Sequence, residues 1–341
     1  MTADPLALCA DLVEQGIVDA LQIAYRRDGV VTSAAFGACD ESSRFALASL
    51  TKPLVAVACL VACEEGVLAL DQPVRDVIPA APCAGTLRDL LCHASGLPAD
   101  SAVARRLQLD PGSTWETVGA MYAELPPECP PQIRRTYSNA GYAVAARMLE
   151  RAAEMPMAEY LGAAVLAPLA MNATTLGAAV DDGSVITVRQ PGLLGHGQQL
   201  FNGARFRALG LPQSGGFGTA GDYLRLLDSV RGLGPEVLAA ETRRELTINQ
   251  GGSLPGGVGD FMEWEVCDWA VGFELRDAKV PHWTGSALSA TSFTHFGAAG
   301  TLAFVDPDRG VEAVLLANRG TYSRWMLEPA AWPAICAALV A

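Results

Sequence analysis

The pattern of hydrophobic positions changes early in the chain, and each pattern predicts a different kind of element. Residues 20–37 form two apolar runs on either side of Asp28-Gly29, a dipeptide typical of tight turns, and this arrangement predicts a β-hairpin. Residues 54–63 are apolar all round the helical repeat, so we expect a buried helix that ends near Gly66.

The middle and the end of the chain extend this picture. Residues 70–230 carry helical patterns between loops rich in proline and glycine, whereas residues 269–276 have the pattern of a strand. Residues 295–319 predict one strand, a tight Asp-Pro-Asp-Arg-Gly turn and an antiparallel partner strand. Residues 324–341 predict a closing helix.

Strands at both ends with helices between them predict an α+β fold, in which an antiparallel β-sheet is flanked by helices and carries a mainly helical insertion. We expect residues 1–70 and 231–341 to build the sheet domain and residues 71–230 to build the helical domain. Because clefts form where such parts meet, the active site is expected at their junction.

Composition narrows the range of partners and compartments. Half of the 341 residues are hydrophobic and 18% are charged, which is enough for a substantial core. The net charge of −13 argues against nucleic acid and anionic membranes as partners. No apolar run reaches a membrane-spanning length without a break, and residues 1–5 are polar and acidic rather than signal-like. We therefore expect a cytoplasmic protein.

Cysteines and histidines are scattered along the chain. The nine cysteines are an odd number without a Cys-x-x-Cys pair, and we interpret them as reduced, packed side chains. The four histidines, His93, His196, His282 and His295, do not cluster at ligand spacing, so neither a metal nor a cofactor is expected. His93 lies in a turn with Gly96 and is interpreted as structural.

The first candidate chemistry comes from the lysines. Lys52 and Lys279 are the only lysines among the 24 lysine and arginine residues, so arginine supplies nearly all of the positive charge. A desolvated lysine can lose its proton and act as a base, which arginine cannot do. Lys52 lies three residues after Ser49, so both side chains would share one face at the start of the buried helix. The alternative is a solvated lysine at a helix start, and the apolar run argues against it.

A second candidate element precedes the helical pattern of residues 140–150. Tyr137 would lie on the loop before this helix, and either Ser138 or Asn139 could cap it. A tyrosine beside a cationic lysine can have a lowered pKa and accept a proton from serine. The alternative is a packed aromatic ring next to a simple cap.

A third candidate element begins the C-terminal hairpin. His295 is followed by Gly297 and Ala298, and the small residues up to Gly300 allow a ligand to approach the strand edge closely. The alternative is an ordinary hairpin with an incidental histidine.

In this order and at this spacing, the three elements resemble the serine β-lactamase and penicillin-binding-protein superfamily, in particular its class C β-lactamase-like branch with the family VIII carboxylesterases and related acyltransferases. Stretches at residues 90–98, 167–174 and 215–222 also fit. The resemblance implies that Ser49 attacks a carbonyl and forms an acyl-enzyme, while Lys52 and Tyr137 relay the proton.

The resemblance also implies roles for the neighbouring residues. The backbone N–H groups of Ser49 and Ala298 would form the oxyanion hole, Asn139 would orient the substrate or Lys52, and His295 with Gly297 would line the cleft. His295 stands where true class C β-lactamases have a lysine that helps to hold the substrate carboxylate. A histidine is a poorer anchor for an anion.

We therefore expect a serine hydrolase that acts on a small-molecule ester, amide or other acyl donor, esterase-like rather than a true β-lactamase. A biosynthetic acyltransferase that passes the acyl group to an alcohol or amine remains an alternative, and a non-catalytic binding module is another. The loop-like residues 189–203, together with residues 261–264 and 282–283, are candidates for the pocket wall, and packed aromatics are the alternative there.

Overall fold

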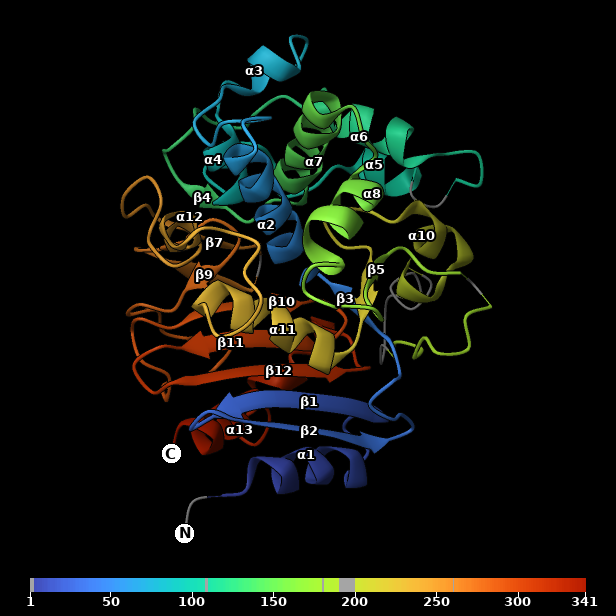
Figure 1. The fold of residues 1–341 in the computed structure, drawn as a ribbon, viewed down its shortest axis with the longest axis vertical. Helices are drawn as coiled ribbons and strands as arrows, with labels where there is room; N and C mark the ends of the chain where they lie inside the picture. Colours follow the sequence, from blue (N-terminus) through green and yellow to red (C-terminus); the bar gives the residue numbers. More distant parts are fainter. Residues whose placement is uncertain (1–2, 108–109, 180, 190–199, 260) are drawn as a thin grey trace.

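The computed structural model describes residues 3–107, 110–179, 181–189, 200–259 and 261–341, and it centres on a six-stranded antiparallel sheet (Figure 1). The strand order is β2-β1-β12-β11-β10-β9, so the first strand of the chain pairs directly with the last one, and β2 lies at the edge. The strands are β1 (Ala20–Arg27), β2 (Val30–Gly37), β9 (Glu274–Leu275), β10 (Phe293–Gly297), β11 (Thr301–Asp306) and β12 (Val311–Ala317).

The predicted first hairpin is confirmed, and its turn explains the sequence there. Strands β1 and β2 pair from Ala20↔Gly37 to Arg27↔Val30, which leaves Asp28 and Gly29 as the two loop residues. Both residues have positive φ angles, 53° and 77°, as a two-residue hairpin turn requires.

The sheet is covered on both faces, so its central strands are apolar runs rather than alternating patterns. Along β1, Leu21 and Ile23 belong to a core shared with α1 (Pro5–Glu14) and α13 (Trp332–Val340). The alternate residues face a second core that includes α11 (Ala220–Arg231), which contacts β1 and β12 (Figure 1).

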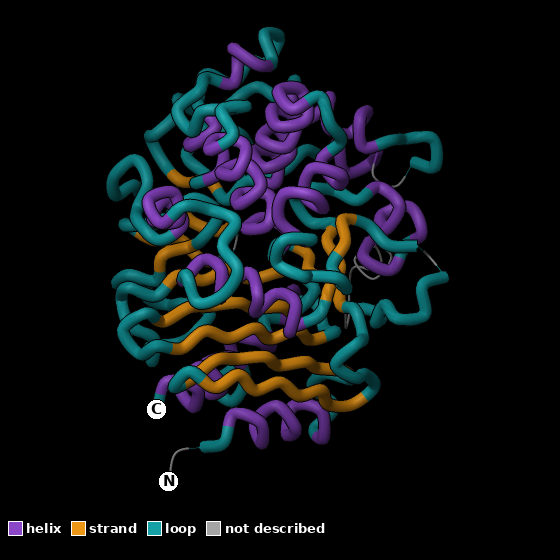
Figure 2. Tube along the Cα trace, in the orientation of Figure 1, coloured by secondary structure: helices purple, strands orange, loops and turns teal. Residues whose placement is uncertain are grey.

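Most of the helices gather on one side of the sheet (Figure 2). At their centre is α2 (Thr51–Glu64), whose side chains from Thr51 to Ala62 are all buried, and it packs against α7 (Asn139–Ala153) and α8 (Met157–Leu161). Its end before Gly66, which has a φ of 73°, confirms the predicted buried helix. The other α-helices in the described residues are α3 (Val74–Val77), α4 (Leu87–Leu91), α5 (Ala102–Leu107), α6 (Trp115–Ala123), α10 (Ala204–Leu209) and α12 (Ala240–Arg243), and a π-helical turn (Gly162–Leu166) follows α8.

Two small sheets connect the large sheet to the helices. One contains β3 (Phe45–Ala48), β6 (Gly216–Gly218) and β5 (Thr175–Leu176), and the other contains β4 (Arg135–Thr136), β7 (Gly256–Val258) and β8 (Met262–Trp264). The predicted α+β architecture with an antiparallel sheet flanked by helices is confirmed. The domain boundaries at residues 70 and 231 stay a prediction. No helix in the described part of the chain is long and apolar enough to cross a membrane.

Three predicted elements were wrong in detail. The segment expected to form one strand from residue 295 to 306 is two antiparallel strands, β10 and β11, because the chain reverses through a turn that ends at Gly300 with a φ of 101°. The strand expected at residues 269–276 is only the two residues of β9. The closing helix begins at Trp332 rather than Arg324, because Arg324 has a left-handed φ of 55° between two short 3₁₀ turns.

Candidate active site

Ser49 lies in the short connection between a strand and the buried central helix. Strand β3 ends at Ala48, and α2 begins at Thr51, so Ser49 stands just before the helix rather than within it. Ala48 has a φ of 49°, a left-handed conformation that costs a non-glycine residue on the order of 1 kcal/mol or more. This strained residue directs the chain so that Ser49, at 9% exposure, faces the buried lysine.

Lys52 is completely buried and contacts three oxygen atoms. Its Nζ lies 3.1 Å from Ser49 Oγ and donates to Asn139 Oδ1 at 2.7 Å and to the Gln213 backbone carbonyl at 2.8 Å. Burial lowers the pKa of Lys52 from 10.5 to about 7, and the negative charge of Asp100 acts in the opposite direction.

These contacts prepare the lysine to take a proton from the serine. Asn139 Oδ1 and the Gln213 carbonyl can only accept hydrogen bonds, so they hold two N–H groups of Lys52. When the amine is neutral, its lone pair is left for the Ser49 hydroxyl. A base whose pKa is close to neutrality is well matched to this proton transfer.

Tyr137 lies between β4 and α7, with its ring against the lysine. Lys52 Nζ is 4.9 Å from the ring centroid. The Ser49 hydroxyl is near enough to lower the pKa of Tyr137 somewhat, although the phenol oxygen has no well-formed hydrogen bond to any group in the described ranges.

The predicted direction of the Tyr137 pKa was wrong. Burial of the phenol oxygen is the largest effect and raises the pKa, and the charge of Glu274 raises it further. Tyr137 therefore carries its proton at neutral pH. In this state Tyr137 can donate a proton, but it cannot act as a general base.

Asn139 begins α7 and does not cap it. Ser138 is the cap, because its Oγ accepts from the Gly141 N–H at 2.9 Å. The Asn139 side chain is thus free to bridge two groups: its Oδ1 accepts from Lys52, and its Nδ2 donates to Asp100 Oδ2 at 3.1 Å.

His93 has the structural role that was expected, and it supports Tyr137. Its Nδ1 accepts from the Ser138 N–H at 3.0 Å, and its backbone carbonyl accepts from the Thr136 N–H. The ring centroid lies 4.6 Å from that of Tyr137 and 4.5 Å from that of Trp269. Burial and the nearby Lys52 lower the pKa of His93 well below its usual value, so this histidine stays neutral.

The end of β10 packs directly against the end of β3. A Cβ atom on Gly297 would lie 2.4 Å from the Leu47 carbonyl oxygen and 3.3 Å from Ala48 Cβ, so only glycine fits. This contact brings the turn that starts at Ala298 next to Ser49. The N–H groups of Ala298 and Ser49 are the pair that the resemblance implies for the oxyanion hole.

His295 is fully buried on β10 beside the tyrosine. Its ring centroid is 6.0 Å from that of Tyr137, and its Nδ1 lies 2.9 Å from the Phe296 carbonyl oxygen. Burial, assisted by the charge of Lys52, lowers the pKa of His295 to about 3. The side chain is therefore neutral at physiological pH and offers no positive charge to a substrate.

The expected pocket wall is only partly described. Residues 190–199 of the candidate loop, with His196 among them, lie outside the described residues. Trp283 is fully buried and stacks on Phe296, with their ring centroids 4.0 Å apart. His282 is only 5% exposed, so Trp283 and His282 both pack in the core. Phe261 is half-buried, and its ring centroid lies 6.1 Å from that of Trp283.

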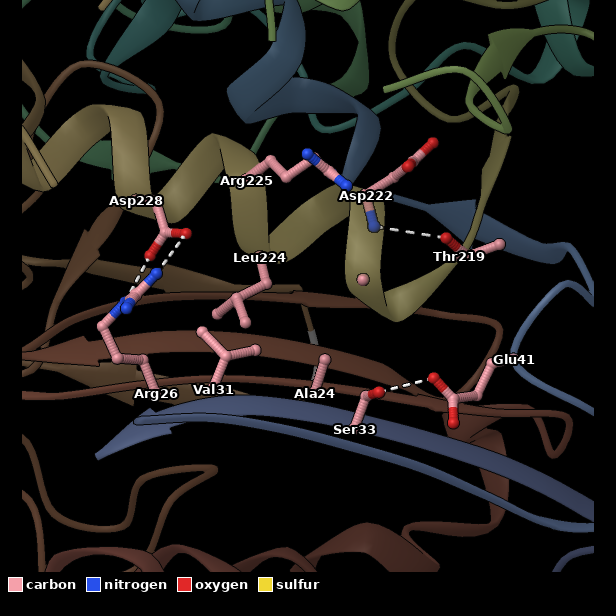
Figure 3. Close-up of a pocket in the computed structure, with 11 residues that line it drawn as sticks. Ala24, Arg26, Val31, Ser33, Glu41, Thr219, Asp222, Leu224, Arg225 and Asp228 are labelled. Carbon is pink, nitrogen blue, oxygen red and sulfur yellow. Dashed lines mark hydrogen bonds and ion pairs between the residues drawn. The ribbon is translucent and has the colours of Figure 1, made fainter. Parts of the chain in front are cut away.

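A cavity of about 450 Å³ lies away from these residues, between the first hairpin and α11 (Figure 3). Arg26 reaches across it and makes two hydrogen bonds of 2.8 Å to Asp228. None of the residues that line this cavity is a predicted catalytic residue, so we do not assign the chemistry to it.

The sequence did not single out Asp100 or Gln213, although both contact the site. Gln213 acts through its backbone carbonyl, which no side-chain motif reveals. Asp100 was missed because it accepts its hydrogen bond from Asn139 across a separation of 39 residues in the sequence.

Comparisons with known proteins show the family and the fold of the chain. A family model described as Beta-lactamase matches residues 7–330. Esterase EstB of Burkholderia gladioli is 30% identical over 355 residues, which covers 90% of this chain and 87% of the esterase. A beta-lactamase structure from Mycobacterium bovis is 31% identical, with a TM-score of 0.70 over 97% of this chain and 98% of that one. EstCE1, described as a hydrolase with promiscuous acyltransferase activity, shares the fold at 19% identity, with a TM-score of 0.79 over 99% of this chain and 97% of that one.

Proposed function

The chain belongs to the beta-lactamase family of serine hydrolases, and on this premise we propose that it cleaves a small ester or amide through an acyl-enzyme on Ser49. The observation that carries the proposal is the environment of Lys52. This amine is fully buried, has a pKa of about 7, is held by two carbonyl oxygens and lies next to the Ser49 hydroxyl. It is therefore preorganised to act as a general base.

In the proposed first step, Ser49 Oγ attacks the substrate carbonyl carbon while its proton moves to Lys52 Nζ. The carbonyl oxygen becomes an oxyanion and accepts hydrogen bonds from the N–H groups of Ser49 and Ala298. Tyr137 donates its proton to the leaving group and is reprotonated from Lys52, which restores the neutral amine. The products are an acyl-enzyme and a free alcohol or amine. Water then attacks the acyl carbon and gives its proton to Lys52 Nζ, the bond to Ser49 Oγ breaks, and the proton returns to Oγ as the carboxylic acid leaves.

We propose esters rather than β-lactams as the preferred substrates, because His295 is neutral and buried. A carboxylate-bearing substrate would find no cation at this position to offset the loss of its hydration. EstB, which matches 90% of this chain, is named an esterase.

The second candidate is acyl transfer to an alcohol or amine. Ser49 is only 9% exposed and lies near Tyr137, whose ring packs against those of His93 and Trp269, so the nucleophile has restricted access to bulk water. An acceptor that binds next to the acyl-enzyme would then compete well with water. Added amines that divert p-nitrophenyl butyrate turnover from butyrate to butyramide would support this candidate.

The proposal is tested by covalent labelling and by substrate comparison. A serine-directed phosphonate should add one mass equivalent to the native protein and none to Ser49→Ala. p-Nitrophenyl butyrate should be hydrolysed clearly and nitrocefin weakly or not at all. Equal labelling of both proteins would exclude Ser49 as the nucleophile. No labelling and no turnover would favour a non-catalytic binding module, and nitrocefin turnover that rivals ester turnover would overthrow the esterase assignment.

A further inference from the structure

A carboxylate lies at the outer end of a hydrogen-bond chain that starts at the nucleophile. The chain runs from Ser49 Oγ to Lys52 Nζ over 3.1 Å, from Lys52 Nζ to Asn139 Oδ1 over 2.7 Å, and from Asn139 Nδ2 to Asp100 Oδ2 over 3.1 Å. We propose that Asp100 is a positioning residue, which fixes the orientation of the Asn139 amide and thereby the proton-accepting geometry of Lys52. This inference rests on the proposed function.

The chemistry of a carboxylate explains how Asp100 sets the direction of the chain. An ionised carboxylate only accepts hydrogen bonds, so the NH₂ end of the Asn139 amide must face it. The carbonyl end of the amide is then turned towards Lys52. If the amide turned over, its NH₂ group would face the lysine amine, and the acceptor that holds one lysine N–H would be lost. The Asn139 backbone N–H also donates to the Ala99 carbonyl at 2.7 Å, so the same loop is fixed twice.

Asp100 is itself held in place from the opposite side. The hydroxyl of Tyr122, a fully buried residue of α6, donates to Asp100 Oδ1 at 2.6 Å, and the Ser101 N–H donates to the same oxygen at 2.7 Å. Among the contacts that the described residues make, Oδ1 is thus anchored to the scaffold, and Oδ2 accepts from Asn139. This division is typical of a residue that transmits a fixed geometry rather than of a solvated surface charge.

The charge of Asp100 also acts on Lys52, because it opposes the effect of burial. In the part of the chain that the structure describes, the other titratable side chains around the amine are Tyr137 and Tyr142, whose ring centroids lie 4.9 and 5.7 Å away, and the histidines at positions 93 and 295. Burial keeps both tyrosines protonated and both histidines neutral. Asp100 is therefore the group whose negative charge favours the cationic form of Lys52.

The test compares Asp100→Asn, Tyr122→Phe and the native protein. Asp100→Asn keeps the size and an oxygen for Asn139 but removes the charge, whereas Tyr122→Phe removes a bond to Asp100 and keeps the charge. The measurement is the rate constant for phosphonate labelling of Ser49 between pH 5 and 9, which depends on the fraction of neutral Lys52. In Asp100→Asn, loss of the negative charge should lower the pKa of Lys52, so the acid limb of the profile of labelling rate against pH should move to lower pH by about one unit. Tyr122→Phe should leave the acid limb in place.

A second comparison separates charge from orientation. Asp100→Ala removes the acceptor as well, so its maximal labelling rate should fall about tenfold below that of Asp100→Asn, which retains an oxygen for Asn139. Thermal unfolding of each variant shows whether the fold is intact. If the alanine variant unfolds, the maximal labelling rate of Tyr122→Phe, which loses an anchor of Asp100, tests the orientation instead and should fall below the native rate.

The outcomes distinguish the inference from the function on which it rests. An unlabelled native protein would overturn the proposed function and the inference together. A native protein that is labelled normally, beside an Asp100→Asn variant with an unmoved acid limb and an Asp100→Ala variant with a native rate, would overturn the inference alone.

Discussion

Replacement of Lys52 by methionine should stabilise the fold near pH 6 while it abolishes activity. Burial lowers the pKa of this lysine from 10.5 to about 7, which means that folding disfavours its charged form. A shift of this size corresponds to about 5 kcal/mol of lost stability at any pH where the folded protein still binds the proton. Methionine has a similar volume and no charge to desolvate.

Lost hydrogen bonds reduce the expected gain. Asn139 Oδ1 and the Gln213 carbonyl would each lose a donor, at a cost of about 1–2 kcal/mol each. Lys52→Met should therefore be more stable than the native protein by roughly 1–3 kcal/mol at pH 6, when the two effects are combined.

The advantage should disappear as the pH rises. Between about pH 7 and 10.5, the unfolded chain still binds the lysine proton and the folded chain does not, so the native protein gains up to about 1.4 kcal/mol per pH unit. The variant lacks this titration. By pH 9 the native protein should equal or exceed Lys52→Met in stability.

Urea unfolding of both proteins at pH 6 and pH 9 measures this difference. Lys279 is the matched control, because it is the chain's other lysine, is also buried, and forms an ion pair with Glu274 at 3.3 Å. Lys279→Met would leave Glu274 unpaired and should be destabilising at both pH values. A stability difference between Lys52→Met and the native protein that is the same at pH 6 and pH 9 would refute the reasoning.

Three further substitutions test the site by activity. Lys52→Arg should reduce p-nitrophenyl butyrate turnover on the order of a thousandfold, because guanidinium cannot accept the serine proton, and retention of more than a tenth would make Lys52 a simple charge. His295→Lys should shift the kcat/KM ratio towards nitrocefin by about ten- to a hundredfold through a charge-assisted hydrogen bond, and an unchanged ratio would place specificity elsewhere. Gly297→Ala would set a Cβ atom 2.4 Å from the Leu47 carbonyl oxygen. It should cost about 1–3 kcal/mol in urea unfolding and most of the activity, whereas Gly221→Ala, which lies in α11 with nothing within 4 Å, should lower neither the stability nor the activity.

Local chemistry explains why part of the fold was predictable from the sequence. Asp28-Gly29 specifies a two-residue turn by the φ angles that it tolerates, and the apolar run of residues 54–63 specifies a buried helix by its hydrophobicity on every side. The same local reasoning placed Ser49 and Lys52 one turn apart, and the structure brings their side chains to 3.1 Å. These features depend on a few neighbouring residues.

Features set by distant parts of the chain were not predictable in this way. The turn between β10 and β11 was missed because its residues before Gly300 are alanines, which carry no turn signal. The Tyr137 pKa was given the wrong direction because the burial that raises it arises from rings such as Trp269, far away in the sequence. Asp100 escaped notice for the same reason, since its contact with Asn139 depends on how a loop is folded.

Several features around Ser49 destabilise the folded state, and they support a catalytic role independently of the sequence motifs. Ala48 adopts a left-handed conformation, Lys52 is buried with a lowered pKa, and Tyr137 Oη and His295 Nε2 are buried without a hydrogen-bond partner in the described part of the chain. Each of these features destabilises the folded state, and a glycine, a methionine or an apolar ring could relieve them. A site that only held the fold together, or only bound a ligand through its surface, would gain nothing from a desolvated amine beside a serine. The same features are what proton transfer from Ser49 requires, which is why we attribute them to function rather than to packing.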